Sequence, residues 1–126
     1  MRETISLLKK QADKVFSEYI RRRDADWKDE NFCFTCGVKK HWKQLQCGHY
    51  ESRGNNNTRF DERNSQPQCV KCNVFHYGEK TIFALRLMEK YGKGILDTLR
   101  KKAQKIKQFT PKELKAIIKK YQWLSP

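Results

Sequence analysis

Residues 69–76 read Cys-Val-Lys-Cys-Asn-Val-Phe-His, and this stretch decides the fold that the sequence predicts. Its cysteines, Cys69 and Cys72, form the second of two Cys-x-x-Cys pairs, 32 residues after the first pair, Cys33 and Cys36. A tight turn between cysteines at this spacing points both sulfurs at one metal ion. Four thiolates suit the tetrahedral coordination of zinc, and a closed shell of this kind is structural rather than catalytic. The pattern therefore predicts a structural Zn²⁺ site.

Two alternatives remain for these four cysteines, namely free buried thiols or a redox motif. Two separated pairs argue against a single redox dithiol, and in a reducing compartment such pairs favour metal over disulfide bonds. The fifth cysteine, Cys47, is interpreted as a small buried hydrophobic residue rather than a ligand. Metal binding at the four-thiolate site is expected to be required for folding, because its binding energy is folding energy.

The composition is that of a small, strongly basic chain. Its 126 residues suffice for one domain, or for one small core with appended helices. Apolar residues make up 37% and charged residues 33%, a lean core that a bound metal would stabilise. The net charge is +14, and residues 31–126, with twenty basic and seven acidic side chains, carry about +13 of it. Such a field attracts a polyanion, above all nucleic acid; the alternative is a basic surface that is only solvated.

Hydropathy argues against a membrane protein. No apolar run approaches the length that crosses a bilayer, and the N-terminus lacks the apolar block of a signal peptide. We therefore expect a cytoplasmic protein without membrane partners.

Apolar periodicity predicts an amphipathic helix from Thr4 to about Asp26, capped by Thr4 or Ser6. The apolar stripe of this helix is expected to form core or a dimer face rather than a ligand site. Residues 44–50 alternate weakly and predict a short strand. An asparagine-rich loop follows, and residues 58–60 are the predicted return strand.

Three further helices are predicted after the second cysteine pair, at residues 81–91, 95 to about 107, and 110–121. The last has a strong start, because residues 110–113 place a threonine cap, a proline in the first turn and a glutamate three residues after the cap. The expected inward-facing residues of these helices include Ile82, Phe83, Leu85, Ile95, Leu99, Ile106, Leu114 and Ile118.

Together these elements predict an α+β fold that forms one structural unit. We divide it into an N-terminal amphipathic helix within residues 1–30, a zinc-binding core at residues 31–78, and basic C-terminal helices within residues 79–126.

Four polar side chains lie between or just after the cysteine pairs: His49, Asn64, Asn73 and His76. Such a cluster around a zinc site suggests hydrolysis of a phosphodiester, which needs a base to deprotonate water and a divalent cation to stabilise charge. Each residue also has a structural interpretation. His49 could be a hydrogen-bonded strand histidine, Asn64 a turn cap, and Asn73 a helix-terminal hydrogen-bonding residue, while His76 could lie on the surface.

The spacing from Asn64 to Asn73 through the second cysteine pair, with His49 upstream, resembles the HNH (ββα-metal) nucleases that carry a zinc-binding treble clef. The resemblance implies His49 as general base, Asn64 as the residue that orients it and braces the loop, and Asn73 as a ligand of a catalytic Mg²⁺ or Mn²⁺. The stretch Cys-x2-Cys-Asn-x2-His is also similar to the phage junction resolvase endonuclease VII, whose position matching His76 is acidic. His76, one helical turn from Asn73, is therefore expected to share the metal.

A closer resemblance covers roughly residues 31–100. It rests on residues 46–50, 58–61 and 68–73, together with Asn64 and Gly78. These stretches resemble the phage recombination proteins called NinG or Rap, which act on branched recombination intermediates such as the Holliday junction. The resemblance implies a phage- or prophage-encoded protein in the host cytoplasm, with branched DNA as its substrate and recombination proteins as its partners.

One departure from the HNH pattern concerns position 48. Many HNH enzymes place Asp or His just before the base as a second metal ligand, whereas this chain has Gly48. Either Asn73, His76 and water molecules suffice, since magnesium keeps its waters and borrows substrate oxygens, or Asp61 or Glu62 contributes. Degenerate, inactive HNH domains exist, so loss of activity is the other alternative.

Basic residues near the centre and on the C-terminal helices are expected to bind backbone phosphates without reading sequence. They are Arg53, Arg59, Arg63, Lys71, Arg100, Lys101, Lys102 and Lys105. Neither a recognition helix nor a base-stacking motif stands out, which favours a structure-selective endonuclease. Symmetric cutting of a four-way junction needs two sites, so we expect a homodimer with the N-terminal helix at its interface. The alternatives are a non-catalytic zinc-containing DNA-binding accessory protein and an RNA-binding zinc protein.

Overall fold

The computed structural model describes residues 4–124 and has the expected α+β composition. The outer ends of the predicted N- and C-terminal segments, residues 1–3 and 125–126, lie outside the described residues. In chain order the elements are α1 (Ile5–Arg22), β1 (Glu30–Phe32), β2 (Lys39–His41), a 3-10 turn η1 (Trp42–Gln44), β3 (Leu45–His49), α2 (Asn56–Arg59), β4 (Ser65–Cys69), a π-helical turn η2 (Lys71–Phe75), α3 (Lys80–Tyr91), α4 (Ile95–Gln104) and α5 (Pro111–Leu124).

The strands form two antiparallel hairpins, β1 with β2 and β3 with β4. The predicted strand at residues 44–50 is confirmed as β3, but the predicted return strand at residues 58–60 is wrong. Residues 58 and 59 end the short helix α2, and the partner of β3 is β4, in a register that pairs His49 with Ser65. All five residues of β4 are buried, so its sequence Ser-Gln-Pro-Gln-Cys shows no alternation that periodicity could detect.

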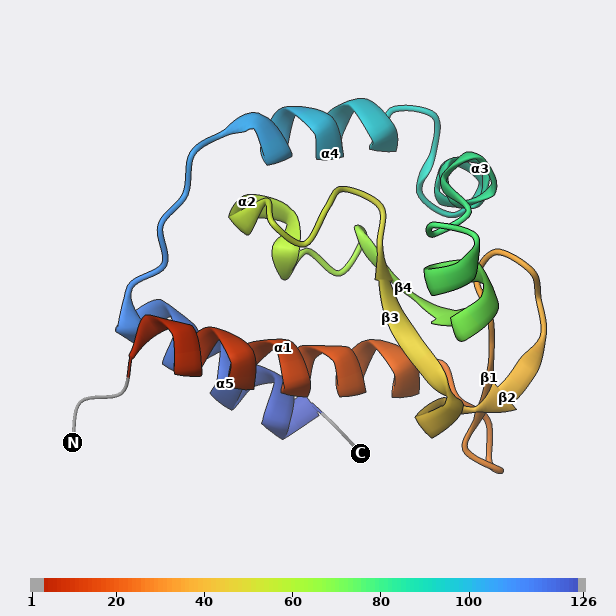
Figure 1. Cartoon of the computed structure of the whole chain (residues 1–126), viewed down its shortest axis with the longest axis horizontal. Helices are drawn as coiled ribbons and strands as arrows, with labels where there is room; N and C mark the ends of the chain where they lie inside the picture. The colour runs from red at the N-terminus through yellow and green to blue at the C-terminus, as the bar shows by residue number, and fades with distance from the viewer. Residues whose placement is uncertain (1–3, 125–126) are drawn as a thin grey trace.

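Helix α1 packs against α5 and β3, and Figure 1 shows α1 and α5 side by side with α4 on the far side of the β3–β4 hairpin. The hydroxyl of Thr4 accepts a hydrogen bond from the amide of Leu7 at 3.1 Å, which confirms Thr4 as the cap. The apolar stripe is core, because Leu8, Ala12, Phe16 and Ile20 are buried within the chain. The helix ends at Arg22, four residues before the predicted end.

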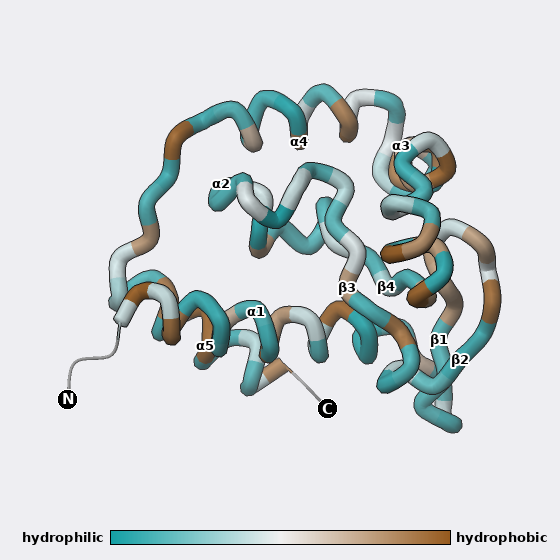
Figure 2. The backbone as a smooth tube through the Cα atoms, viewed as in Figure 1, coloured by the Kyte–Doolittle hydropathy of each residue, from teal (hydrophilic) through white to brown (hydrophobic). Residues whose placement is uncertain are grey.

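A second apolar cluster joins α3 to α4 through Phe83, Leu87, Ile95 and Leu99. Three residues predicted to face inward are exposed instead, namely Ile82, Leu85 and Ile106. Ile106 is 97% exposed because α4 ends at Gln104, before the apolar period reaches it. Figure 2 shows only short hydrophobic stretches along the helices, and none of the helices within residues 4–124 is long and apolar enough to span a membrane.

The start of α5 has the predicted capping box. The amide of Glu113 donates to the hydroxyl of Thr110 at 3.2 Å, and the Glu113 carboxylate accepts from the amide of Thr110 at 3.0 Å. This reciprocal pair satisfies two amides at the helix start, and it places Leu114 and Ile118 against α1.

Candidate functional site

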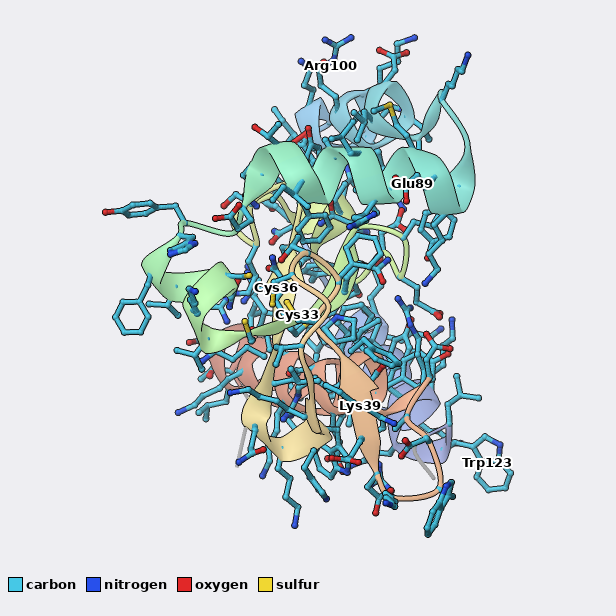
Figure 3. The ribbon with its side chains drawn as sticks, turned by 90° about the vertical axis from the view of Figure 1, so that its right-hand side faces the viewer. Cys33, Cys36, Lys39, Glu89, Arg100 and Trp123 are labelled. Carbon is cyan, nitrogen blue, oxygen red and sulfur yellow. The ribbon has the colours of Figure 1, made fainter. Side chains whose placement is uncertain are left out.

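The four predicted zinc ligands meet in one cluster. The ligand atoms of Cys33, Cys36, Cys69 and Cys72 all lie within 4.8 Å of one another, and Figure 3 shows the first two near the centre of the molecule. The sulfurs of Cys36 and Cys69 are 3.7 Å apart. Zinc–sulfur bonds of about 2.3 Å in a tetrahedron place neighbouring sulfurs about 3.8 Å apart, so this donor set fits zinc.

The surroundings of the cluster favour thiolates at some positions and oppose them at others. Burial disfavours the Cys33 thiolate, but hydrogen bonds from the Thr35 hydroxyl and from backbone amides outweigh it and lower the pKa of Cys33 to about 6. Burial raises the pKa of Cys72 to about 12. A divalent cation bound by the four sulfurs would favour the thiolate form of each. Cys47 lies outside the cluster, and desolvation raises its pKa to about 12, so it is a neutral thiol as expected of a non-ligand.

A cavity of about 320 Å³ lies beside this cluster, between α1 and β3. It brings together two of the predicted catalytic residues, His49 from β3 and Asn73 from η2. Arg53, one of the predicted DNA-binding residues, lines the same cavity, and so does Asp13 from α1. Strand β3 links the two residues, because its Gln46 accepts a hydrogen bond from Asn73 and its last residue is His49, at the end of the hairpin away from Cys69.

The hydrogen bonding of His49 suits a general base. Its Nε2 lies 3.0 Å from the backbone carbonyl oxygen of Arg59, and since a carbonyl only accepts, Nε2 carries the hydrogen. The neutral ring then keeps Nδ1 as its proton acceptor. Burial lowers the pKa of His49 below its ordinary value, more than the contact with the Arg59 carbonyl raises it. The imidazole is therefore neutral, and able to take a proton, at neutral pH.

Asn64 braces the loop that holds His49. It is fully buried, its Oδ1 accepts from the amide of Glu51 at 2.7 Å, and its Nδ2 donates to the carbonyls of Glu51 and Thr58 at 3.0 and 3.2 Å. These bonds tie the two sides of the loop between β3 and β4, the loop that carries the Arg59 carbonyl. The loop held by Asn64 thus includes the residue whose carbonyl contacts the His49 ring.

The structure separates Asn73 from His76. The Nδ2 of Asn73 donates to Oε1 of Gln46 at 2.8 Å, which leaves the Asn73 Oδ1 as an acceptor at the cavity. His76 lies outside the cavity, where its Nδ1 is 2.7 Å from Oε1 of Glu79. Of the two predicted metal ligands, only Asn73 thus lies with His49.

Asp13 is the site residue that sequence reasoning missed. Among residues 4–124, it is the acidic side chain that lines this cavity, and it is held by Arg59, whose Nε lies 2.8 Å from the Asp13 Oδ1. The pair is mostly buried, with the two side chains 20% and 12% exposed. The sequence does carry a signal for Asp13. Its carboxylate lies at the edge of the buried stripe of α1, beside Ala12 and one turn before Phe16. Both carboxylate oxygens of Asp13 accept hydrogen bonds from the Arg59 guanidinium, which holds the carboxylate in place.

The family model described as "Bacteriophage Lambda NinG protein" matches residues 3–125. The chain belongs to this family. It is 34% identical over 114 residues to protein ninG of Salmonella phage P22, and 32% identical over 114 residues to protein ninG of Escherichia phage lambda. These alignments cover 90% of this chain and 53% of each relative, so the chain spans about half the length of these NinG proteins. No solved structure matches the chain significantly.

Position 48 of this NinG-family chain has no room for the acidic or histidine side chain that the resemblance to HNH nucleases leads one to look for there. A Cβ added at Gly48 would overlap Oε1 of Gln68. Gln68 is fully buried, and its Nε2 donates to the Thr35 hydroxyl at 3.1 Å and to the carbonyl of Gly78 at 2.9 Å. Because Thr35 in turn contacts the sulfur of Cys33, the side chain that excludes a ligand at position 48 supports the zinc cluster.

The two acidic residues considered as replacements for that ligand lie elsewhere in the NinG-family fold. The carboxylate of Asp61 pairs with Arg63 at 3.0 Å and with Lys102 at 2.7 Å, and the pKa of Asp61 is lowered to about 2, since these partners outweigh its burial. Glu62 accepts from the hydroxyl of Tyr121 at 3.1 Å. Neither lines the cavity that holds His49.

The predicted DNA-binding residues of the chain fall into two groups. Arg53 lines the cavity, Arg59 bonds Asp13 and the carbonyl of Arg53, and Lys71 is exposed on η2. The α4 residues lie farther away, and Figure 3 shows Arg100 projecting into solvent at one end of the molecule, far from the labelled cysteines. Several form ion pairs with acidic neighbours: Arg63 and Lys102 with Asp61, and Arg100 and Lys101 with Asp97.

Proposed function

We propose that this NinG-family chain is the nuclease module of a metal-dependent, structure-selective DNA endonuclease of the HNH (treble-clef ββα-metal) type. It hydrolyses phosphodiester bonds in branched recombination intermediates. The observation that carries the proposal is the shared cavity of His49 and Asn73 beside four clustered cysteines. A buried neutral imidazole next to oxygen ligands is the arrangement that phosphodiester hydrolysis requires.

In the proposed reaction, Nδ1 of His49 takes a proton from the attacking water. The Arg59 carbonyl holds the ring through Nε2 and thereby keeps the reactive tautomer. The Oδ1 of Asn73 and the carboxylate of Asp13 would hold Mg²⁺ or Mn²⁺. When bound, the cation supplies charge stabilisation at the scissile phosphate and at the leaving oxygen. Arg53 at the cavity rim binds a phosphate of the same strand.

The charge supports DNA as the substrate. A net charge of +14 favours a polyanion, and cations at the cavity would contact phosphates, which position a duplex without reading its sequence. A homodimer would supply the second site for symmetric cutting of a four-way junction. His76 lies outside the cavity, so we do not include it among the metal ligands.

The deciding experiment is a cleavage assay on labelled four-way junction, flap and linear duplex DNA of matched sequence. Wild type is expected to nick the branched substrates in Mg²⁺ or Mn²⁺, and His49→Ala to lose cleavage by about 10²- to 10⁴-fold while its affinity for the junction is kept. Competition with RNA of the same shape tests the nucleic acid preferred. A wild-type protein that binds junctions but never cleaves them with any divalent metal is a DNA-binding accessory protein instead.

A further inference from the structure

The segment that follows the last zinc cysteine exposes apolar side chains to solvent. Val74, Phe75 and Tyr77 are 50%, 70% and 87% exposed. Large apolar side chains gathered in this way mark interaction sites more often than single exposed residues do. We call residues 74–77 the aromatic tip. Figure 3 shows the η2 segment projecting from one side of the molecule.

The aromatic tip is anchored at both ends to the candidate site. Before it, Asn73 bonds Gln46 of β3 at 2.8 Å. After it, the carbonyl of Gly78 accepts from Nε2 of Gln68 at 2.9 Å. The ammonium of Lys80 then donates to the carbonyl of His49 and, at 2.9 Å, to the carbonyl of Tyr50. These hydrogen bonds therefore hold the aromatic tip in a fixed position relative to His49.

The backbone of the tip is unusual as well. Tyr77, Gly78 and Glu79 have φ values of 53°, 87° and 49°, so three consecutive residues adopt the left-handed region. Only glycine does this at no steric cost, and the other two persist because surrounding contacts hold them. The Glu79 carboxylate, which contacts the His76 ring at 2.7 Å, is one such contact. This turn keeps the Tyr77 ring in solvent, so packing within the chain does not stabilise the ring there.

We propose that Phe75 and Tyr77 stack on unpaired nucleobases at the branch point of a DNA substrate. Aromatic rings stack on any base, and apolar side chains inserted at base steps read deformability rather than sequence. Lys71, which is exposed at the start of η2, supplies positive charge beside the tip that suits the adjoining phosphates. Asn73 joins the tip to the cavity, so a base held by the tip sets which phosphate reaches His49. This inference rests on the proposed action on branched DNA, and it identifies Phe75 and Tyr77 as the residues that recognise the branch point.

The test uses four-way junctions with 2-aminopurine at the branch or in the middle of one arm, with Ca²⁺ in place of Mg²⁺. Wild type is expected to change the fluorescence of the branch probe and not that of the arm probe. Phe75→Ala and Tyr77→Ala should lose most of this change and bind the junction about tenfold more weakly, with little effect on linear duplex. Phe75→Trp and Tyr77→Trp keep an aromatic face and should keep the signal.

Trp123→Ala is the matched control, because Trp123 is also 87% exposed and Figure 3 shows it on the other side of the molecule from the η2 segment. It should behave as wild type. Zinc content and circular dichroism establish that each variant is folded. A double variant of Phe75 and Tyr77 that binds junctions with wild-type affinity and signal would overturn the inference. So would a double variant whose only defect is loss of self-association in sedimentation, since the tip would then contact a second copy.

The two proposals fail separately. Junction cleavage with an unaltered branch probe removes the stacking inference and leaves the endonuclease. A tip-dependent probe signal without cleavage in any divalent metal keeps the stacking contact and removes the catalytic proposal. A wild-type protein that does not bind DNA removes both.

Discussion

The Nε2 of His49 lies 3.0 Å from the backbone carbonyl of Arg59, and the side chain of the same arginine pairs with Asp13 of α1. One residue therefore positions both the proposed base and the proposed carboxylate ligand. Asn64 braces the loop that carries this arginine, so the geometry of the site depends on a segment with little regular structure.

The pH dependence of cleavage should report His49. A protonated imidazole cannot accept a proton, so the single-turnover rate should rise with pH and level off once His49 is neutral. Because burial lowers the pKa of His49 below 6.5, the rise should be centred below pH 6.5. Rates in Mg²⁺ on one nicked substrate measure this. A rise centred above pH 7 would indicate another base or titration of metal-bound water. His49→Ala is the control, because its residual rate should show no rise below pH 6.5 if His49 is the base.

Zinc should be needed for folding. Structural zinc binds with about 10–16 kcal/mol in small peptide sites, which is as large as the total stability of a typical domain, about 5–15 kcal/mol. Cys33→Ser or Cys69→Ser should therefore lose bound zinc in elemental analysis and lose cooperative thermal unfolding. Cys47→Ala is the control, because Cys47 lies outside the cluster and should retain one zinc per chain. Equal zinc content in all three variants would refute the four-cysteine site.

Gly48 and Gln68 should be energetically coupled. Gly48→Ala forces its methyl group onto the buried Gln68 side chain and should cost about 1–3 kcal/mol of unfolding free energy. Gln68→Ala removes the clash but loses the hydrogen bonds to Thr35 and Gly78. The double variant should be more stable than the sum of the single losses by about 1 kcal/mol, measured by denaturant unfolding. Strict additivity would show that the Gln68 side chain moves aside without cost.

Asp13→Asn should weaken the response to metal. Losing the carboxylate is expected to raise the Mg²⁺ concentration for half-maximal cleavage by about tenfold. It should also cost about 1.5–3 kcal/mol of stability, since it removes hydrogen bonds between charged groups that hold Arg59. Glu89→Gln is the control, because Glu89 is 65% exposed in its pair with Arg86 and should change neither quantity. Lower stability with an unchanged Mg²⁺ requirement would restrict Asp13 to positioning Arg59.

The sequence by itself determined the features that local chemistry encodes. The spacing of Cys33, Cys36, Cys69 and Cys72 predicted a cluster that the structure forms, because each pair is a short turn. Helical periodicity predicted the buried stripe of α1, and the capping box at Thr110 predicted the start of α5, since both depend on neighbours within one or two turns.

Only the tertiary structure decided what depends on distant neighbours. The polar strand Ser65–Cys69 has no periodicity because both of its faces are buried, so its pairing with β3 could not be predicted. The packing of α1 against β3 places Asp13 in the cavity, and the anchored turn at residues 77–79 turns the tip outward and leaves His76 outside the cavity. Side-chain direction at these positions is set by contacts between segments far apart in the chain, which no local pattern records.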